Sequence, residues 1–182
     1  LSRIAYRGGR TECFVRGSPP EKIKYYDFNS LYPFVMAHYH YPYFRSFVGK
    51  VSNVNLDFEG IADCLIFQEG LIPPLGVKRK FSDGGRKLIF PEGRVRGVFT
   101  YPELRLLEES GRGKILKVYR GYAWKEKSTP FRKFVLAFYE KRNKTQEFSV
   151  FYKYLLNSLY GKFGQDPETE EIELKKDGKV IR

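Results

Sequence analysis

The chain of 182 residues is 42% hydrophobic, which excludes a disordered polymer and gives enough length for one compact domain. Its 33 lysine and arginine residues outnumber 21 aspartate and glutamate residues, so the net charge is +12 and a polyanionic partner is favoured. Aromatic residues make up 17% of the chain and are mixed with cations in KVYRGYAWKEK (117–127), a pattern typical of nucleic-acid surfaces and also of half-exposed sheets.

The two cysteines, Cys13 and Cys64, are isolated and form no CxxC pattern, which favours a reducing, intracellular setting. His38 and His40 stand close together in AHYHYP, but no further His or Cys supports a metal site, so a solvated turn is the favoured interpretation. The chain has no signal-like or membrane-spanning run, and we therefore expect no membrane partner.

The first predicted element is a strand at IKYYDF (23–28), which is rich in β-branched and aromatic residues. A helix follows, with Ser30 as its cap and Pro33 in its first turn. Asp27 lies at the end of the predicted strand, where a carboxylate is costly unless it is paired. It either forms a salt bridge with a lysine or arginine, or binds Mg²⁺ (or Mn²⁺) together with phosphate oxygens.

The segment 39–126 is predicted to be a small α+β insertion of short strands and turns. A short helix is predicted in TYPELRLLEESG (100–111), because Thr100 and Glu103 form a capping box and Gly111 is a closing residue. The other predicted elements are the strands GIADCLIF (60–67) and KILKVYRGYAW (114–124) and the turns FSDGG (81–85) and FPEGRVRG (90–97).

Two antiparallel helices are predicted next. Thr129 and Pro130 mark the start of the first, and the second runs from about 147 to 162, after a break near KTQEF. The first helix carries an apolar stripe of Phe131, Phe134, Val135 and Phe138. The tail ETEEIELKKDGKVIR (168–182) alternates and contains Asp177-Gly178, so a hairpin is predicted there.

The tetrapeptide Asn-Ser-Leu-Tyr occurs twice, before Pro33 and before Gly161, so the first copy is predicted to open one helix and the second to close another. At about 100° per residue, Lys153, Asn157 and Tyr160 fall on one face of the second helix. An ammonium, an amide and a phenol in one column suit a nucleotide, although a solvated face is the simpler interpretation. The predicted apolar back of this helix consists of Phe148, Phe151, Leu155 and Leu159.

Two of these segments resemble motifs of the family-B DNA polymerases. DFNSLYP (27–33) resembles motif A and KYLLNSLYGKFG (153–164) resembles motif B, in forms most similar to those of the protein-primed polymerases of phages and linear plasmids. AYRGG (5–9) resembles the YxGG segment that precedes motif A. The interval from Asp27 to Asn157 is long enough for the insertion that binds the terminal protein in that branch.

The resemblance implies an α+β fold and an order of parts along the chain. These parts are a partial palm at 1–38, an insertion at 39–126 resembling the terminal-protein-binding region, an antiparallel two-helix fingers element at 127–163, and a truncated return to the palm at 164–182. We therefore expect this chain to be the central portion of a longer polymerase.

The resemblance also implies the site residues. Asp27, with the main-chain carbonyl of Phe28, would hold the catalytic metal ions, and Tyr32 would lie under the deoxyribose and exclude ribonucleotides. Lys141 and Lys153 would bind the triphosphate. The other implied residues are Leu31, Asn157 and Tyr160 at the nucleotide, and Tyr6, Arg7, Gly8, Gly9, Ser30, Gly161 and Lys162 at the DNA. A further family lysine, expected four residues before Lys153, is replaced by Ser149 here.

The Tyr-x-Asp-Thr-Asp segment that supplies the second metal-binding aspartate in the family does not occur in the 182 residues. We therefore expect the chain alone to be inactive, because a two-metal site needs both carboxylates. Expected partners are primer-template DNA, dNTPs, a terminal protein and the remainder of the polymerase, in a host cytoplasm for a phage or an organelle for a linear plasmid. The alternative is a non-catalytic module that retains the polymerase fold and binds nucleic acid or replication proteins.

Overall fold

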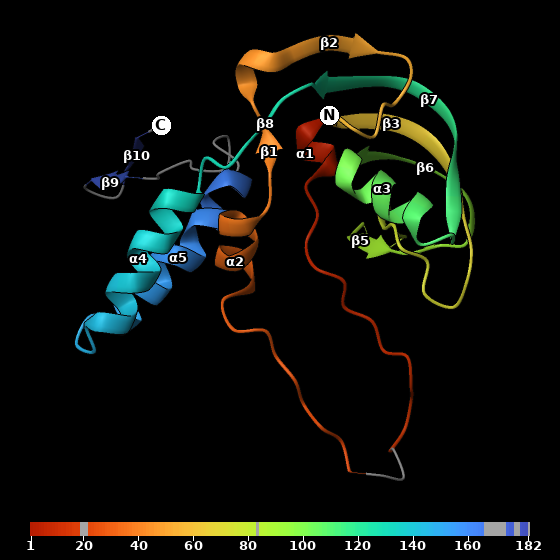
Figure 1. Cartoon of the computed structure of the whole chain (residues 1–182). Helices are drawn as coiled ribbons and strands as arrows, with labels where there is room; N and C mark the ends of the chain where they lie inside the picture. The colour runs from red at the N-terminus through yellow and green to blue at the C-terminus, as the bar shows by residue number, and fades with distance from the viewer. Residues whose placement is uncertain (19–21, 83, 166–173, 177–178, 182) are drawn as a thin grey trace.

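The protein is described by a computed structural model that covers residues 1–18, 22–82, 84–165, 174–176 and 179–181 (Figure 1). Its mixture of helices and strands confirms the predicted α+β class. The helices are α1 (Ser2–Ala5), α2 (Leu31–His38), the 3-10 turn η1 (Phe44–Ser46), α3 (Tyr101–Glu109), α4 (Arg132–Lys144) and α5 (Ser149–Gly164). The strands are β1 (Tyr41–Pro42), β2 (Phe47–Val51), β3 (Glu59–Gln68), β4 (Val77–Lys80), β5 (Arg86–Ile89), β6 (Gly93–Thr100), β7 (Gly113–Trp124), β8 (Lys127–Ser128), β9 (Leu174–Lys176) and β10 (Lys179–Ile181).

A four-stranded antiparallel sheet, with the order β2-β7-β3-β6, forms the body of the segment between α2 and α4. The predicted strands at 60–67 and 114–124 are confirmed as the two central strands, β3 and β7. Helix α3 packs on one face of the curved sheet, as Figure 1 shows. The core between them includes Ala62, Phe99 and Leu104, none of which has exposed surface, and burying such apolar side chains is the main source of stability for this part.

The capping box predicted for α3 is confirmed. The backbone N–H of Thr100 donates to Glu103 Oε2 at 2.7 Å, and Gly111 takes the left-handed conformation with φ of 66° just after the helix. The predicted turn at 90–97 is wrong in its second half, since residues from Gly93 onward form β6. Their backbone pairs with β3 from Ile61 to Gln68, and this pairing outweighs the turn preference of the local glycines.

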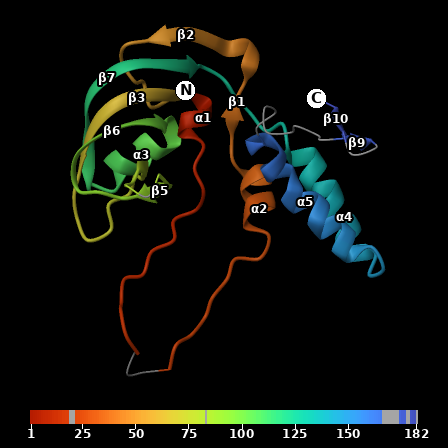
Figure 2. The ribbon, with the colours of Figure 1, turned by 180° about the vertical axis from the view of Figure 1, so that it is seen from behind.

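The helices α2, α4 and α5 form a second layer, which lies beside the sheet in both Figure 1 and Figure 2. Helices α4 and α5 are antiparallel neighbours, as predicted, and α2 packs against both. Their shared core consists of Met36, Ala37, Val135 and Leu156. This small core holds the two copies of Asn-Ser-Leu-Tyr close together, because one copy runs into the first turn of α2 and the other is within α5.

The predicted strand at 23–28 is wrong. The residues before α2 are exposed and extended without strand pairing, and Tyr25 and Tyr26 are 91% and 82% exposed. A strand requires a neighbour for its backbone N–H and C=O groups, and within the described residues no strand pairs with this segment. Ser30 does precede α2, but it is left-handed, with φ of 54°, and its side chain forms no capping bond.

Helix α5 differs from the prediction in its end and its buried face. It continues through Gly161 to Gly164, because one glycine inside a helix costs only about 1 kcal/mol. The predicted apolar back is wrong for Phe148 and Phe151, which are more than half exposed, while Leu159 packs against the shared core and the unpredicted Leu156 is buried in it. The buried face is set by contact with both α2 and α4, which the hydrophobic pattern of α5 alone does not reveal.

The remaining predictions concern the histidines and the tail. His38 ends α2 rather than lying in a turn, and both histidines are exposed. Strands β9 and β10 pair antiparallel, which confirms the predicted hairpin, while its turn at Asp177-Gly178 lies outside the described residues. Among the helices that the structure describes, none is long and apolar enough to cross a membrane.

Candidate functional site

Three tyrosines from distant parts of the chain form a ring cluster, which we call the tyrosine cluster. The rings of Tyr32 on α2 and Tyr160 on α5 are stacked, with centroids 4.4 Å apart and planes at 19°. The ring of Tyr6, just after α1, also stacks on that of Tyr160, with centroids 5.7 Å apart. The segments that resemble motif A, motif B and the YxGG segment therefore meet at one place.

Local packing positions these rings. Pro33 is buried in the first turn of α2 and fixes the start of the helix that carries Tyr32. Gly164 at the end of α5 is required by Tyr6, because a Cβ atom there would lie 2.2 Å from the Tyr6 hydroxyl oxygen. The sequence signal for this contact was the glycine itself, which lies beyond the predicted helix end at about residue 162.

The Tyr160 hydroxyl is held in its protonated form. Burial raises the pKa of Tyr160, and a hydrogen bond with Tyr6 and the neighbouring Tyr32 raise it further. Both partners remain partly accessible, with 38% of Tyr6 and 45% of Tyr32 exposed. The cluster is therefore a neutral aromatic surface that a planar ring or a sugar can contact, and it contributes no charge of its own.

The N-terminal segment is attached to the insertion by Arg7. Its guanidinium donates to the carbonyl oxygens of Gly76 and Val98 and pairs with Glu103 at 3.3 Å. Burial lowers the pKa of Arg7, and the Glu103 carboxylate opposes that change. Arg7, predicted as a DNA contact, thus has its donors engaged within the protein, whereas Gly8 and Gly9 remain exposed.

Asp27, the predicted metal ligand, lies in the exposed segment before α2. Its Oδ1 accepts the backbone N–H of Phe28 at 2.9 Å, and it forms no ion pair with any residue that the structure describes. The alternative in which Asp27 forms a salt bridge with a lysine or arginine is therefore not seen among the described residues. No group of three or more His, Cys, Asp or Glu side chains placed to hold a metal occurs in the described parts.

The predicted triphosphate ligands lie on the exposed surface of α4 and α5. Lys141 on α4 has its Nζ 5.3 Å from the centroid of the Phe138 ring, and Lys153 and Asn157 on α5 are exposed. Of the three residues placed in one column on α5, Tyr160 alone is partly buried, since it turns toward the other tyrosines. Leu31, Gly161 and Lys162 are also exposed.

Ser30 has a partner that the sequence did not reveal. Arg142 on α4 donates to Ser30 Oγ at 3.0 Å, so the residue just before α2 is tied to α4. This contact spans more than a hundred residues, and no local pattern in the sequence indicates it.

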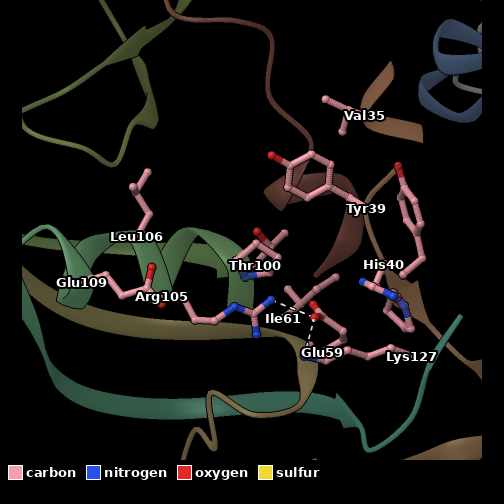
Figure 3. A pocket seen from close by; sticks show the side chains of 14 residues that line it. Val35, Tyr39, His40, Glu59, Ile61, Thr100, Arg105, Leu106, Glu109 and Lys127 are labelled. Carbon is pink, nitrogen blue, oxygen red and sulfur yellow. Dashed lines mark hydrogen bonds and ion pairs between the residues drawn. The ribbon is translucent and has the colours of Figure 1, made fainter. Parts of the chain in front are cut away.

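A cleft of about 650 Å³ opens between α3 and the segment joining α2 to β1 (Figure 3). In its wall, Glu59 is only 4% exposed and accepts a hydrogen bond from Arg105 at 2.8 Å, with Lys127 at 3.5 Å. Arg105 also donates to the carbonyl oxygens of Leu56 and Phe58. None of the predicted site residues lines this cleft, and its charged triad joins β3 and α3 to β8, the strand that precedes α4.

Comparison with known proteins identifies relatives over almost the whole chain. The family model described as "DNA polymerase type B, organellar and viral" matches residues 2–181. A probable DNA polymerase of Neurospora intermedia is 30% identical over 94% of this chain and 19% of its own length. The DNA-directed DNA polymerase of Enterobacteria phage PRD1 is 29% identical over 91% of this chain and 29% of its own length. The chain therefore spans less than a third of these two relatives.

The fold is also similar to a solved structure. Phi29 DNA polymerase in an orthorhombic crystal form matches with a TM-score of 0.57 and 22% identity, over 78% of this chain and 26% of that one. A ternary complex of phi29 DNA polymerase with primer-template DNA and incoming nucleotide substrates matches with a TM-score of 0.55. At this identity the likeness shows the fold alone.

Proposed function

Because the chain belongs to the organellar and viral type B DNA polymerases, we propose that it is the central portion of an enzyme that extends DNA during protein-primed replication. The observation that carries the proposal is the tyrosine cluster, in which Tyr6, Tyr32 and Tyr160 meet from three motif-like segments. Such a meeting is what a nucleotide site built from distant parts of the chain requires.

In the proposed site the sugar and base of a dNTP lie against the tyrosine cluster. The exposed ring of Tyr32 would lie under the deoxyribose and leave no room for a ribose hydroxyl. Lys141 and Lys153 would bind the triphosphate oxygens and stabilise the negative charge that develops during transfer. Asn157 would add a hydrogen bond near the nascent base pair.

Asp27 fits a metal site in part. One carboxylate oxygen accepts the Phe28 N–H, and its other oxygen and the Phe28 carbonyl are suitable ligands for Mg²⁺ or Mn²⁺. Bound metal ions would supply charge neutralisation of the phosphates. One carboxylate does not complete a two-metal site, so we propose that residues 1–182 are inactive alone and that a second carboxylate comes from a Tyr-x-Asp-Thr-Asp segment outside this sequence.

The proposed partners follow from the family. Primer-template DNA would pass near Tyr6, Gly8, Gly9 and Ser30 and continue past Gly161 and Lys162. The insertion at 39–126 would contact the terminal protein that primes synthesis. The enzyme would act inside a cell, beside the phage or linear-plasmid DNA that it copies.

The proposal is tested by joining residues 1–182 to a segment that supplies the missing aspartate and measuring Mg²⁺-dependent dNTP incorporation. Asp27→Ala should abolish incorporation while leaving DNA binding in place. Asp57→Ala is the matched control, because Asp57 is an exposed carboxylate in the insertion. Incorporation that survives Asp27→Ala would refute the metal assignment. If the wild-type polypeptide binds DNA but incorporates nothing, the alternative of a non-catalytic binding module is the correct one.

A further inference from the structure

A second groove, of about 720 Å³, lies at the opposite edge of the insertion sheet from β2, where Lys78 in its wall donates to the carbonyl oxygen of Tyr6. We call it the basic groove. Its walls are α1 with Arg7, the hairpin of β4 and β5, and the adjoining part of the sheet that includes Arg96. Among the described residues that line it, seven are lysine or arginine and one, Asp63, is acidic.

The acidic residue does not neutralise the groove. Asp63 is 7% exposed and is already paired with Arg96 at 3.1 Å and with Arg120 at 3.8 Å, so its charge is balanced from within the sheet. The hydrogen bond to Asp63 raises the pKa of Arg96, which keeps that guanidinium charged. The Arg7 guanidinium is engaged by the carbonyl oxygens of Gly76 and Val98 and by the Glu103 carboxylate. The groove therefore retains an excess of positive charge from the β4–β5 hairpin.

The pairing register of the β4–β5 hairpin is unusual because it places positive side chains directly opposite one another. Lys80 of β4 lies opposite Arg86 of β5, and Arg79 lies opposite Lys87. Like charges directly opposite one another on neighbouring strands destabilise the pair. The segment 77–89 contains five cations and one acid, so this repulsion is built into the sequence. An anion bound between the strands would relieve it.

Lys80 and Arg86 are the residues available to such an anion. Both are exposed, both line the groove, and neither forms an ion pair with a described residue. Arg96, which lines the groove from β6, stacks over the Tyr119 ring on β7 at 4.1 Å, and Lys117 lies 5.1 Å from the same ring. Cations in a row beside an exposed aromatic ring are suited to a backbone that carries regular phosphates next to bases.

We propose that the basic groove binds the phosphate backbone of a nucleic-acid strand through Lys80 and Arg86, as a contact separate from the nucleotide site. An acidic protein segment would also be attracted by the charge, but it would make no use of the ring at Tyr119. The groove has a volume of about 720 Å³ and is lined by cations from both β4 and β5, which suits several phosphates of one strand better than a single small anion. The contact does not depend on Asp27, on a metal or on a dNTP.

The test measures binding of a fluorescein-labelled single-stranded oligonucleotide to the 182-residue chain by anisotropy, in EDTA and over a range of salt concentrations. Each phosphate contact on a single strand contributes about 0.7 to the slope of log affinity against log salt. Lys80→Ala/Arg86→Ala should weaken binding about tenfold and lower the slope by about 1.4. The charge-preserving variant Lys80→Arg/Arg86→Lys should bind as the wild type does.

The matched control is Lys50→Ala/Lys125→Ala, which removes the same charge near the β2 edge of the sheet, where both side chains are exposed. Equal weakening in the two double variants would overturn the proposal, because only net charge would then matter. Thermal unfolding of Lys80→Ala/Arg86→Ala should be unchanged or raised, since the like-charge pair is gone. Poly-glutamate that binds as tightly as the oligonucleotide at equal charge would assign the groove to an acidic protein and refute the nucleic-acid assignment.

Discussion

Replacing Tyr160 should uncouple α2 from α5, and the size of the effect follows from its two ring contacts. Tyr160 stacks on Tyr32 and lies next to Tyr6, and an aromatic pair contributes about 0.5–1.5 kcal/mol beyond the area that it buries. Tyr160→Ala should therefore lower the free energy of unfolding by about 1–3 kcal/mol from the ring pairs alone. Tyr154→Ala is the control, because Tyr154 is on the same helix and is 69% exposed.

A double-mutant cycle isolates the contact between the two motif-like segments. We expect Tyr32→Ala and Tyr160→Ala, singly and together, to give a coupling energy of about 0.5–1.5 kcal/mol from urea unfolding followed by far-ultraviolet circular dichroism. The pair Tyr32→Ala and Tyr154→Ala should be additive. A coupling energy below about 0.3 kcal/mol for Tyr32 and Tyr160 would refute the reasoning, since that is the scatter expected for sites that do not touch.

Three other predictions concern the insertion. Arg105→Ala should lower the free energy of unfolding by about 3–5 kcal/mol, because it leaves the buried Glu59 carboxylate with only Lys127. Lys127→Ala should lower it by less than about 1 kcal/mol. Equal losses for the two variants in urea unfolding would contradict this reasoning. Burial raises the pKa of the Cys64 thiol from 9.0 to about 12, so its contribution to stability is complete below pH 9 and is lost as the pH rises toward 12. Unfolding midpoints across that range should fall less steeply for Cys64→Ala, and parallel curves would exclude this titration. Within the described residues the buried Tyr101 hydroxyl has no hydrogen-bond partner, so Tyr101→Phe should leave the unfolding temperature unchanged or raise it; a clear loss would contradict this.

The sequence predicted correctly those helices, strands and caps that depend only on residues close together in the chain. The capping box at Thr100 and Glu103, the glycine after α3 and the two long strands need only neighbouring residues or a plain hydrophobic pattern, and all were confirmed. Strand β6 was missed because Gly93 and Gly97 indicate a turn when they are considered alone. Its pairing with β3 is a contact at long range, which local propensity does not describe.

The sequence supplied candidate site residues, whose roles stay predictions, but it did not indicate the contacts that these residues make. The three tyrosines were chosen from the motif-like segments, and the structure brings their rings together. The partners that hold them were not predicted: the space that Gly164 leaves for Tyr6 and the bond from Arg142 to Ser30 both depend on how helices pack. The prediction of a strand at 23–28 was wrong for a related reason. A strand needs a neighbouring strand to pair with its backbone N–H and C=O groups, and the local sequence does not show whether one is present.

Photo-crosslinking of azido-dATP to the chain in the presence of Mg²⁺, with the labelled peptides mapped by mass spectrometry, tests the central claim most directly. We expect label in both 25–36 and 152–165, with both signals reduced by Lys153→Ala, because one nucleotide would contact both segments. Label confined to one of these segments, or found only in the cleft beside Glu59, would contradict a shared deoxynucleotide site.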